Sequence, residues 1–335
     1  MRKRVLSLRL AHELDRLYEK APVLRLAPAD KLVIFSDLHM GDGGKRDEFV
    51  PNSGLFLAIL RRYYQKQGSI LVLNGDIEDL AGFSLASIAT RWLEIYQALE
   101  EFASRNALFK LAGNHDLGLL RRRPADLPFP VGESLRVEIG EKRLWIFHGH
   151  QVSRLDWAYE TLGTFLQRWI LRPLGIGNYT VARSASRRFH VERRAYLYAR
   201  AGGMLAVIGH THRPLFESLS RLDTVKIEIE NLCRSYSTAG EKERRGLEER
   251  MARLKREFIE QQRRELRPPR SENLYDEGPL LPCLFNSGSG IGRHGITAIE
   301  IAAGRITLAI WSDRRRSEMY AAAAGFEPQQ LENSD

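Results

Sequence analysis

Cysteine is scarce in this sequence: its 335 residues include only Cys233 and Cys283, which lie far apart. So few cysteines argue against a disulfide framework, and their separation argues against a metal site built from thiolates. The sequence therefore predicts a protein of a reducing compartment, with the cytoplasm as the expected location.

Long uncharged apolar runs are also absent. No stretch approaches about 18 such residues, the length that suggests a transmembrane helix. The basic residues 1–10 are followed by His12, Glu13 and Asp15 rather than by a small-residue cleavage site, which argues against a signal peptide. No internal repeat is recognisable, so a repeat architecture is not expected.

Residues 1–30 are expected to contain an amphipathic helix with leucines along one face, namely Leu6, Leu10, Leu14 and Leu17. The first expectation is that this face packs on the rest of the protein. Binding of the helix to a membrane surface, with the protein peripheral at the inner membrane, is the alternative.

Hydrophobic residues make up 43% of the sequence, which is enough to bury a core. The net charge is +9 and the isoelectric point is near 9.6. A basic protein favours anionic partners, such as phosphate esters, nucleic acid or acidic lipid headgroups. Charge alone does not choose among them.

The first 116 residues alternate between predicted strands and helices. Apolar runs at 31–36, 70–73 and 107–112 predict strands, and helices over about 54–67 and 85–104 separate them. This βαβαβ order predicts a parallel sheet with right-handed crossovers.

The pattern changes after residue 116. Segments 134–139 and 143–147 flank a Gly-Glu-Lys turn and predict an antiparallel hairpin. Residues 151–203 are helical in pattern. Four further strands are expected, at 204–208, 280–285, 296–301 and 305–311. The tail after about residue 317 is expected on the surface.

Polar side chains gather at or just beyond the ends of these strands: Asp37, His39, Asp76, Asn114, His148, His210 and His212. In open α/β sheets, the carboxyl ends of strands are where sites are built. Imidazole and carboxylate ligands together suit divalent Mn, Fe, Zn or Co. Seven such groups exceed what one tetrahedral zinc needs, but they fit two metal ions that share a carboxylate.

Five blocks in this order resemble the signature of the calcineurin-like metallophosphoesterase superfamily: Asp37-x-His39, Gly75-Asp76, Gly113-Asn114-His115-Asp116, His148-Gly149-His150 and Gly209-His210-x-His212. Asn286-Ser287-Gly288-Ser289 resembles the closing segment of the family. The resemblance implies an α/β fold, a four-layer α/β/β/α sandwich. Here it would carry an inserted helical lid and a charged helical arm.

The resemblance also implies a role for each site residue. One divalent metal, with Mn²⁺ first expected, would be held by Asp37, His39, Asp76 and His212. A second would be held by Asp76, Asn114, His148 and His210, with a metal-bridging hydroxide attacking phosphorus. His115 would protonate or stabilise the leaving oxygen, and Asp79 would orient His115. His150 would support the ligands rather than bind a metal.

The insertion at 151–203 carries nine arginines, three acids and no lysine. It also contains Leu, Tyr, Phe and Trp residues at helical spacing. One interpretation is a cap that packs its apolar residues on itself. The other is a lid that binds an anionic phosphoester, with Arg183, Arg187 and Arg188 as candidate substrate-binding residues, and offers an apolar slot to an acyl chain.

The helical lid, the block Gly-His-Thr-His-Arg-Pro and the motif order resemble the UDP-2,3-diacylglucosamine pyrophosphatases, which cleave a lipid-linked nucleotide sugar at the inner membrane face. Those enzymes commonly have arginine where this chain has His115, and this chain adds a charged arm and an amino-terminal helix. The alternatives are a phosphodiesterase or phosphatase acting on a nucleotide, nucleic acid or phosphoprotein, and a metal-free interaction scaffold. Nucleic acid is disfavoured because no nucleic-acid-binding module is apparent.

The arm is a long charged helix over 241–267 with a narrow apolar stripe at Leu247, Met251, Leu254 and Phe258. A solvated hairpin, or a short coiled-coil contact through which chains would oligomerise, is expected. The expected domain organisation has seven parts: an amino-terminal helix at 1–30, catalytic segments at 31–150, 204–221 and 273–316, the lid at 151–203, the arm at 222–272 and a tail at 317–335.

Overall fold

The computed structural model describes residues 8–153, 185–212, 241–265, 283–291, 295–312 and 315–323, with the single residues Pro214, Ile229, Leu232 and Tyr236. The chain forms two compact units. One comprises Met1–Phe216 and Cys283–Asp335, and the other comprises Glu217–Pro282. The predicted lid falls partly outside the described residues, since 154–184 are not among them.

The larger sheet has seven strands in the order β12-β11-β10-β2-β3-β4-β5. Strands β2 to β5 are parallel, while β10, β11 and β12 are antiparallel to their neighbours. Their bounds are β2 Lys31–Phe35, β3 Ile70–Asn74, β4 Leu108–Leu111, β5 Val131–Gly132, β10 Ile296–Ala302, β11 Arg305–Ser312 and β12 Arg315–Ala323. The predicted parallel βαβαβ core is confirmed.

The smaller sheet has five strands in the order β1-β6-β7-β8-β9. Strands β6 and β7 form the predicted antiparallel hairpin, and the other neighbours are parallel. The bounds are β1 Val23–Leu26, β6 Ser134–Ile139, β7 Lys142–Phe147, β8 Leu205–Ile208 and β9 Leu284–Asn286.

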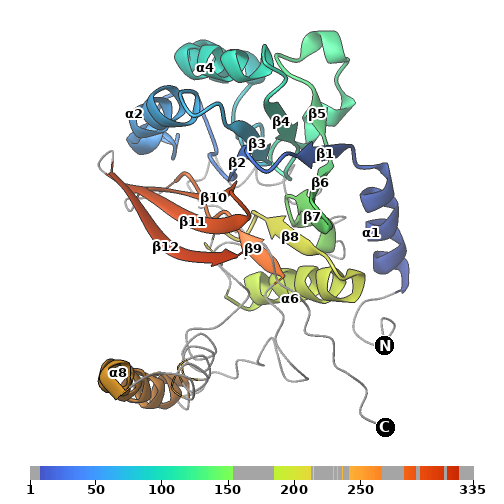
Figure 1. Cartoon of the computed structure of the whole chain (residues 1–335). Helices are drawn as coiled ribbons and strands as arrows, with labels where there is room; N and C mark the ends of the chain where they lie inside the picture. Colours follow the sequence, from blue (N-terminus) through green and yellow to red (C-terminus); the bar gives the residue numbers. More distant parts are fainter. Residues whose placement is uncertain are drawn as a thin grey trace. The chain divides into compact units, whose positions relative to one another are not determined.

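The two sheets bury one apolar layer between them, to which Ile34 and Val72 contribute from one sheet and Leu144 and Val207 from the other. Helices α2 (Val50–Ile59), α3 (Leu85–Arg91) and α4 (Leu93–Ala103) cover the outer face of the larger sheet. Helices α1 (Leu8–Lys20) and α6 (Ala185–Gly202) cover the smaller sheet, as Figure 1 shows. The fold is the predicted four-layer α/β/β/α sandwich.

Helix α1 packs on the domain, as first expected. Leu10 and Leu14 are buried, and the Tyr18 ring meets Trp145 of β7 edge-on at 5.7 Å. Arg136 Nε donates to the Ala21 carbonyl just beyond the helix end, where positive charge also complements the helix dipole.

Helix α6 forms part of the sandwich. Its Ala195, Tyr196 and Ala199 are buried, and Tyr198 is packed against Trp145 with 5.4 Å between ring centroids. Residues 185–202 of the predicted lid therefore form a helix that packs on the smaller sheet.

Several elements differ from the sequence prediction. The helix expected over 54–67 begins at Val50 and ends in a π-helical turn, Leu60–Tyr64. The helix expected over 85–104 breaks at Trp92, whose indole N–H donates to the Gly41 carbonyl at 2.8 Å. Strand β1 lies in the predicted amino-terminal helical segment, and strand β12 lies in the predicted tail.

Three short 3₁₀ helices complete the main unit. The 3₁₀ helices η2 (Leu117–Arg121), η3 (Pro124–Asp126) and η4 (His150–Ser153) connect strands of the main unit.

In the second unit, the apolar stripe of α8 (Glu241–Glu265) packs on Ile229 and Leu232. This stripe therefore has a partner within its own unit.

The packing of Trp145 yields a stability prediction. Trp145 is fully buried and stacks on Phe147 with 4.0 Å between ring centroids. Trp145→Ala should lower the free energy of unfolding by about 3–5 kcal/mol, because it leaves a large cavity. Urea denaturation measures this, with the exposed Arg25→Ala as control. If Trp145→Ala lowered the free energy of unfolding no more than the control does, this packing of Trp145 would be contradicted.

Candidate metal centre

Three loops that follow strands of the larger sheet are joined by backbone hydrogen bonds. The Asp37 N–H donates to the Gly75 carbonyl at 3.0 Å, and the His39 N–H donates to the Asp76 carbonyl at 2.9 Å. The His115 N–H donates to Asp76 Oδ1 at 2.8 Å. These bonds hold the loops after β2, β3 and β4 side by side around the Asp76 carboxylate.

The backbone at these loops is strained. Within the described part of the chain, seven non-glycine residues have a positive φ, and five of them are site candidates: Asp37, His39, Asp76, His210 and His212. A non-glycine residue in this region costs energy and persists only where its surroundings enforce it. Such strain clusters at functional sites, and here it marks the strand ends that the sequence singles out.

Two glycines make room for this arrangement. A Cβ at Gly113 would lie 2.2 Å from Asp76 Oδ1, and a Cβ at Gly75 would lie 2.5 Å from His148 Nδ1. Gly75 also has a φ of +81°. The glycines that precede Asp76 and Asn114 are thus required by close approach of the side chains.

The first cluster comprises Asp37, His39, Asp76 and His212, whose ligand atoms lie within 4.8 Å of one another. His212 Nε2 is 3.1 Å from Asp37 Oδ1 and 3.1 Å from His39 Nε2. His39 Nε2 is 3.8 Å from Asp76 Oδ2. Nitrogen and carboxylate oxygen atoms therefore converge on one small volume.

The second cluster comprises Asp76, His148 and His210, again within 4.8 Å. His148 Nδ1 donates to the Asn74 carbonyl at 2.8 Å, which directs Nε2 toward Asp76 Oδ2 at 3.2 Å. Among the described residues, no hydrogen-bond partner is found for His148 Nε2, His210 Nε2 or Asn114 Oδ1, all of which are buried. Orphaned buried acceptors of this kind fit a bound cation.

The charges in the site follow from burial and from neighbouring groups. Burial lowers the pKa of His210 to about 3, with the nearby His148 acting in the same direction. Burial likewise lowers the pKa of His39 to about 4. Neutral imidazoles are the form that binds metal. Burial would raise the pKa of Asp76, but His148 and His115 hold it well below its ordinary value.

His115 and Asp79 form a third cluster with His39, whose ligand atoms also lie within 4.8 Å of one another. His115 Nδ1 lies 2.9 Å from Asp79 Oδ1, and the His115 and His39 rings meet edge-on at 4.6 Å. Burial would lower the pKa of His115, but the carboxylates of Asp76 and Asp79 raise it to about 9. These carboxylates therefore favour the protonated form of His115.

Asp116 was not given a role by the sequence, yet it supports the site. It is fully buried, and its two carboxylate oxygens accept the N–H groups of Gly113 at 2.5 Å and Ile77 at 2.9 Å. It thereby joins the loops after β3 and β4. The position of Asp116 directly after Asn114-His115 was the only sequence signal for this function.

A buried ionic group lies behind the same loops. Glu78 Oε1 accepts hydrogen bonds from Lys110 Nζ and from Tyr96 Oη, the latter at 2.6 Å. On the other side, Asn286 Nδ2 donates to the Gly209 carbonyl and to Thr211 Oγ1, both at 2.9 Å. The Thr211 hydroxyl in turn donates to Glu192 of α6. These side chains fix the loops that carry Asp76, His210 and His212.

The candidate substrate-binding arginines are placed only in part. Arg188 lies on α6 and is half-buried. Arg183 and the side chain of Arg187 lie outside the described residues. The structure therefore brings together six of the seven metal-ligand candidates, namely Asp37, His39, Asp76, His148, His210 and His212, with His115 and Asp79 beside them. Asn114 has a buried Oδ1 atom, and its part in the second cluster stays a prediction, as does the role of the arginines.

Comparison with known proteins identifies the class. The family model for calcineurin-like phosphoesterases matches residues 31–214, more than half of the sequence. The chain belongs to this family, whose members hydrolyse phosphoester bonds. The predicted enzyme class is thus confirmed, and the metal-binding clusters agree with it.

Solved structures similar to this chain have low sequence identity. Vacuolar Protein Sorting 29 from Cryptosporidium parvum is 11% identical, with a TM-score of 0.39, and the match covers 89% of this chain and 100% of that one. A predicted phosphoesterase from Streptococcus pneumoniae TIGR4 is 12% identical, with a TM-score of 0.33 and the same coverage. Comparison with curated proteins gives no match.

None of the helices described by the structure is both long enough and apolar enough to cross a membrane.

The convergence of ligand atoms predicts that divalent metal stabilises the protein. At a free metal concentration about 100 times the dissociation constant, the stabilisation should be about 2.7 kcal/mol. Thermal unfolding with Mn²⁺ should therefore occur at a higher temperature than in EDTA. A His148→Ala/His210→Ala variant should lose most of this difference. An equal response to Mn²⁺ in that variant would rule out the second cluster as a metal site.

Proposed function

We propose that the protein is a dinuclear metal-dependent phosphoesterase that hydrolyses a phosphoester or pyrophosphate bond in a lipid-linked or nucleotide-sugar substrate similar to UDP-2,3-diacylglucosamine. The observation that carries the dinuclear part is the sharing of Asp76 by two ligand clusters. A shared carboxylate is how two-metal hydrolytic sites hold their ions close together.

The ligand sets combine the two clusters with Asn114, which the family resemblance adds. Asp37, His39, Asp76 and His212 would hold one ion, and Asp76, Asn114, His148 and His210 would hold the other. Mixed imidazole and carboxylate ligands suit Mn²⁺, with Fe, Zn or Co as alternatives. When bound, the ions supply Lewis-acid polarisation of the phosphoryl oxygens and activation of water.

His115 is proposed to donate a proton to the leaving oxygen. Two observations support this role: the carboxylates of Asp76 and Asp79 raise the pKa of His115 to about 9, and its ring lies 4.6 Å from that of the ligand candidate His39. Asp79 accepts the hydrogen bond of Nδ1–H and so directs Nε2 away from itself. Asp79 is thereby a positioning residue for His115.

The substrate assignment rests on residues 151–203 and on net charge. The arginine excess of this segment favours an anionic phosphoester, and its aromatic and leucine residues offer apolar surface for an acyl chain. Such a substrate would place the protein in the cytoplasm, peripheral to the inner membrane. Arg183, Arg187 and Arg188 are proposed to bind the phosphate groups.

Asp76 and Asp79 should differ sharply in importance. Asp76→Asn removes a charged oxygen from both clusters, so turnover should fall by far more than in Asp79→Asn. Loss of a supporting partner typically costs about 10–100-fold. Steady-state kinetics with Mn²⁺ and bis(p-nitrophenyl) phosphate measure this, with the surface variant Asp126→Asn as control. Wild-type kcat in Asp76→Asn would refute the shared-ligand role.

His115→Ala should leave metal content intact and lower kcat by about 10²–10⁴-fold, the usual cost of losing a general acid. The loss should be smaller for p-nitrophenyl leaving groups, which depart without protonation. Metal content is measured by mass spectrometry of the dialysed protein. Loss of metal from this variant would make His115 a ligand instead.

Replacing Arg183, Arg187 and Arg188 together by Gln should raise KM for a long-chain acylated pyrophosphate and weaken binding to anionic vesicles. Both effects should shrink with added salt, because screening weakens exposed charge interactions. Turnover of bis(p-nitrophenyl) phosphate provides the comparison. If both substrates suffer equally, or neither suffers, the arginines have no part in substrate selection.

A further inference from the structure

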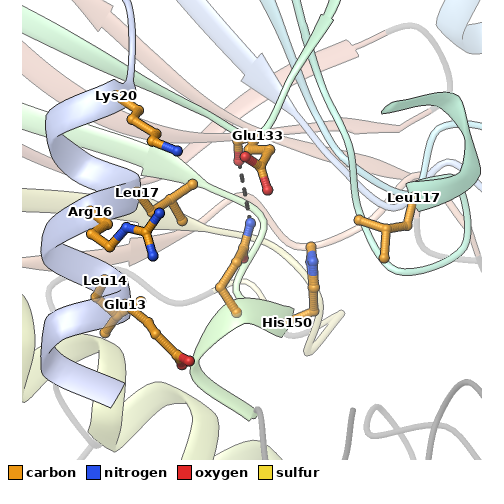
Figure 2. Close-up of a pocket in the computed structure, with 9 residues that line it drawn as sticks. Glu13, Leu14, Arg16, Leu17, Lys20, Leu117, Glu133 and His150 are labelled. Carbon is orange, nitrogen blue, oxygen red and sulfur yellow. Dashed lines mark hydrogen bonds between the residues drawn. The ribbon is translucent and has the colours of Figure 1, made fainter. Parts of the chain in front are cut away.

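A cleft of about 280 Å³ lies beside the metal centre and is lined by α1 on one side. Figure 2 shows Arg16 and Lys20 extending from α1 toward Glu133, with Leu117 on the opposite side and His150 below. None of these residues is among the metal-ligand candidates. The cleft is therefore a feature additional to the centre itself.

The walls of the cleft continue directly from the loops of the metal centre. His150 follows two residues after His148, and their ring centroids are 5.5 Å apart. Leu117 follows Asp116, which joins the loops after β3 and β4. Gln151 accepts the Gly149 N–H at 2.9 Å and donates to the Glu133 carbonyl at 3.3 Å, the bond dashed in Figure 2.

The wall formed by α1 is held in place before any ligand binds. Leu14 is buried, and the Tyr198 hydroxyl donates to Asp15 Oδ1 at 2.7 Å. A preformed wall lowers the entropy cost of binding. Leu17 and Leu117 add apolar surface to the cleft.

Two cations of the lining, Arg16 and Lys20, are available to bind an anion. Arg16 and Lys20 are one helical turn apart, and two like charges at this spacing disfavour a helix. Among the described residues, neither side chain forms an ion pair. Of the two acids in the lining, Glu13 is paired with Arg9 at 3.5 Å, and Glu133 is exposed. An anion between Arg16 and Lys20 would relieve their repulsion, and the Arg16 guanidinium matches phosphate geometry.

We propose that this cleft binds a second, non-scissile phosphate of the substrate, with the sugar or apolar group attached to it. Arg16 and Lys20 bind the phosphate, the leucines contact the apolar portion, and Glu133 accepts hydrogen bonds from hydroxyl groups. The assignment rests on the proposed phosphoesterase function, and it selects diphosphate diesters over simple phosphate esters.

The test variant is Arg16→Gln/Lys20→Gln, whose side chains are exposed and whose helical propensity is preserved. The control is Arg25→Gln/Arg123→Gln, which removes the same charge from exposed ion pairs away from the cleft. Two readouts are used. One is calorimetric binding of UDP-N-acetylglucosamine to the full-length, metal-free protein, and the other is the ratio of its kcat/KM to that of bis(p-nitrophenyl) phosphate with Mn²⁺.

The dissociation constant should rise about tenfold or more in the test variant, and the kcat/KM ratio should fall by a similar factor, as expected for lost charged hydrogen bonds. The control should retain wild-type values. Wild-type binding and ratio in the test variant would overturn the assignment of the cleft. Absence of turnover of both substrates by the wild type would overturn the proposed function instead, and calorimetry would still decide the cleft.

Discussion

The geometry of the site depends on the Asp76 carboxylate, which belongs to both ligand clusters. Asp76 lies just beyond the end of the central parallel strand β3. Its backbone carbonyl accepts the His39 N–H, its Oδ1 accepts the His115 N–H, and its Oδ2 lies 3.2 Å from His148 Nε2. Loops from both sheets therefore meet at one side chain. The close contacts of Gly75 and Gly113, and the positive φ angles of the neighbouring residues, are the cost of bringing the loops this close.

The sandwich explains how such strain is maintained. The apolar layer between the sheets fixes the strands, and their polar ends then converge at one edge. Behind the loops, Asp116 and the Glu78–Lys110 pair satisfy backbone and side-chain groups that would otherwise be buried without partners. Asn286 does the same for the loop after β8. The metal centre is thus supported from two sides by buried hydrogen bonds.

The strands and the clustering of Asp and His side chains at their ends were predictable, because short apolar runs ending in Asp, Asn or His are strong local signals. The parallel core and the hairpin followed from them. Other features of the fold depend on contacts between residues far apart in the sequence and could not be predicted from local patterns. Strand β1 alternates between exposed and half-buried residues and lies on a sheet edge, so its short sequence carries little apolar signal. The break of the helix at Trp92 coincides with a hydrogen bond from its indole to the Gly41 carbonyl, which the sequence does not reveal. The sequence likewise does not show that Lys110 is buried and paired with Glu78. The packing of α6 on the smaller sheet likewise depends on tertiary contacts, not on its arginine content.

The central claim is that two metal ions share Asp76, and anomalous scattering from crystals of the Mn²⁺-loaded protein tests it most directly. Two-metal hydrolytic sites place their ions about 3.5–4 Å apart. The account predicts two anomalous peaks at that separation, both in contact with the Asp76 carboxylate, one near His39 and His212 and the other near His148 and His210. A single peak, or two peaks of which one lies away from Asp76, would contradict it.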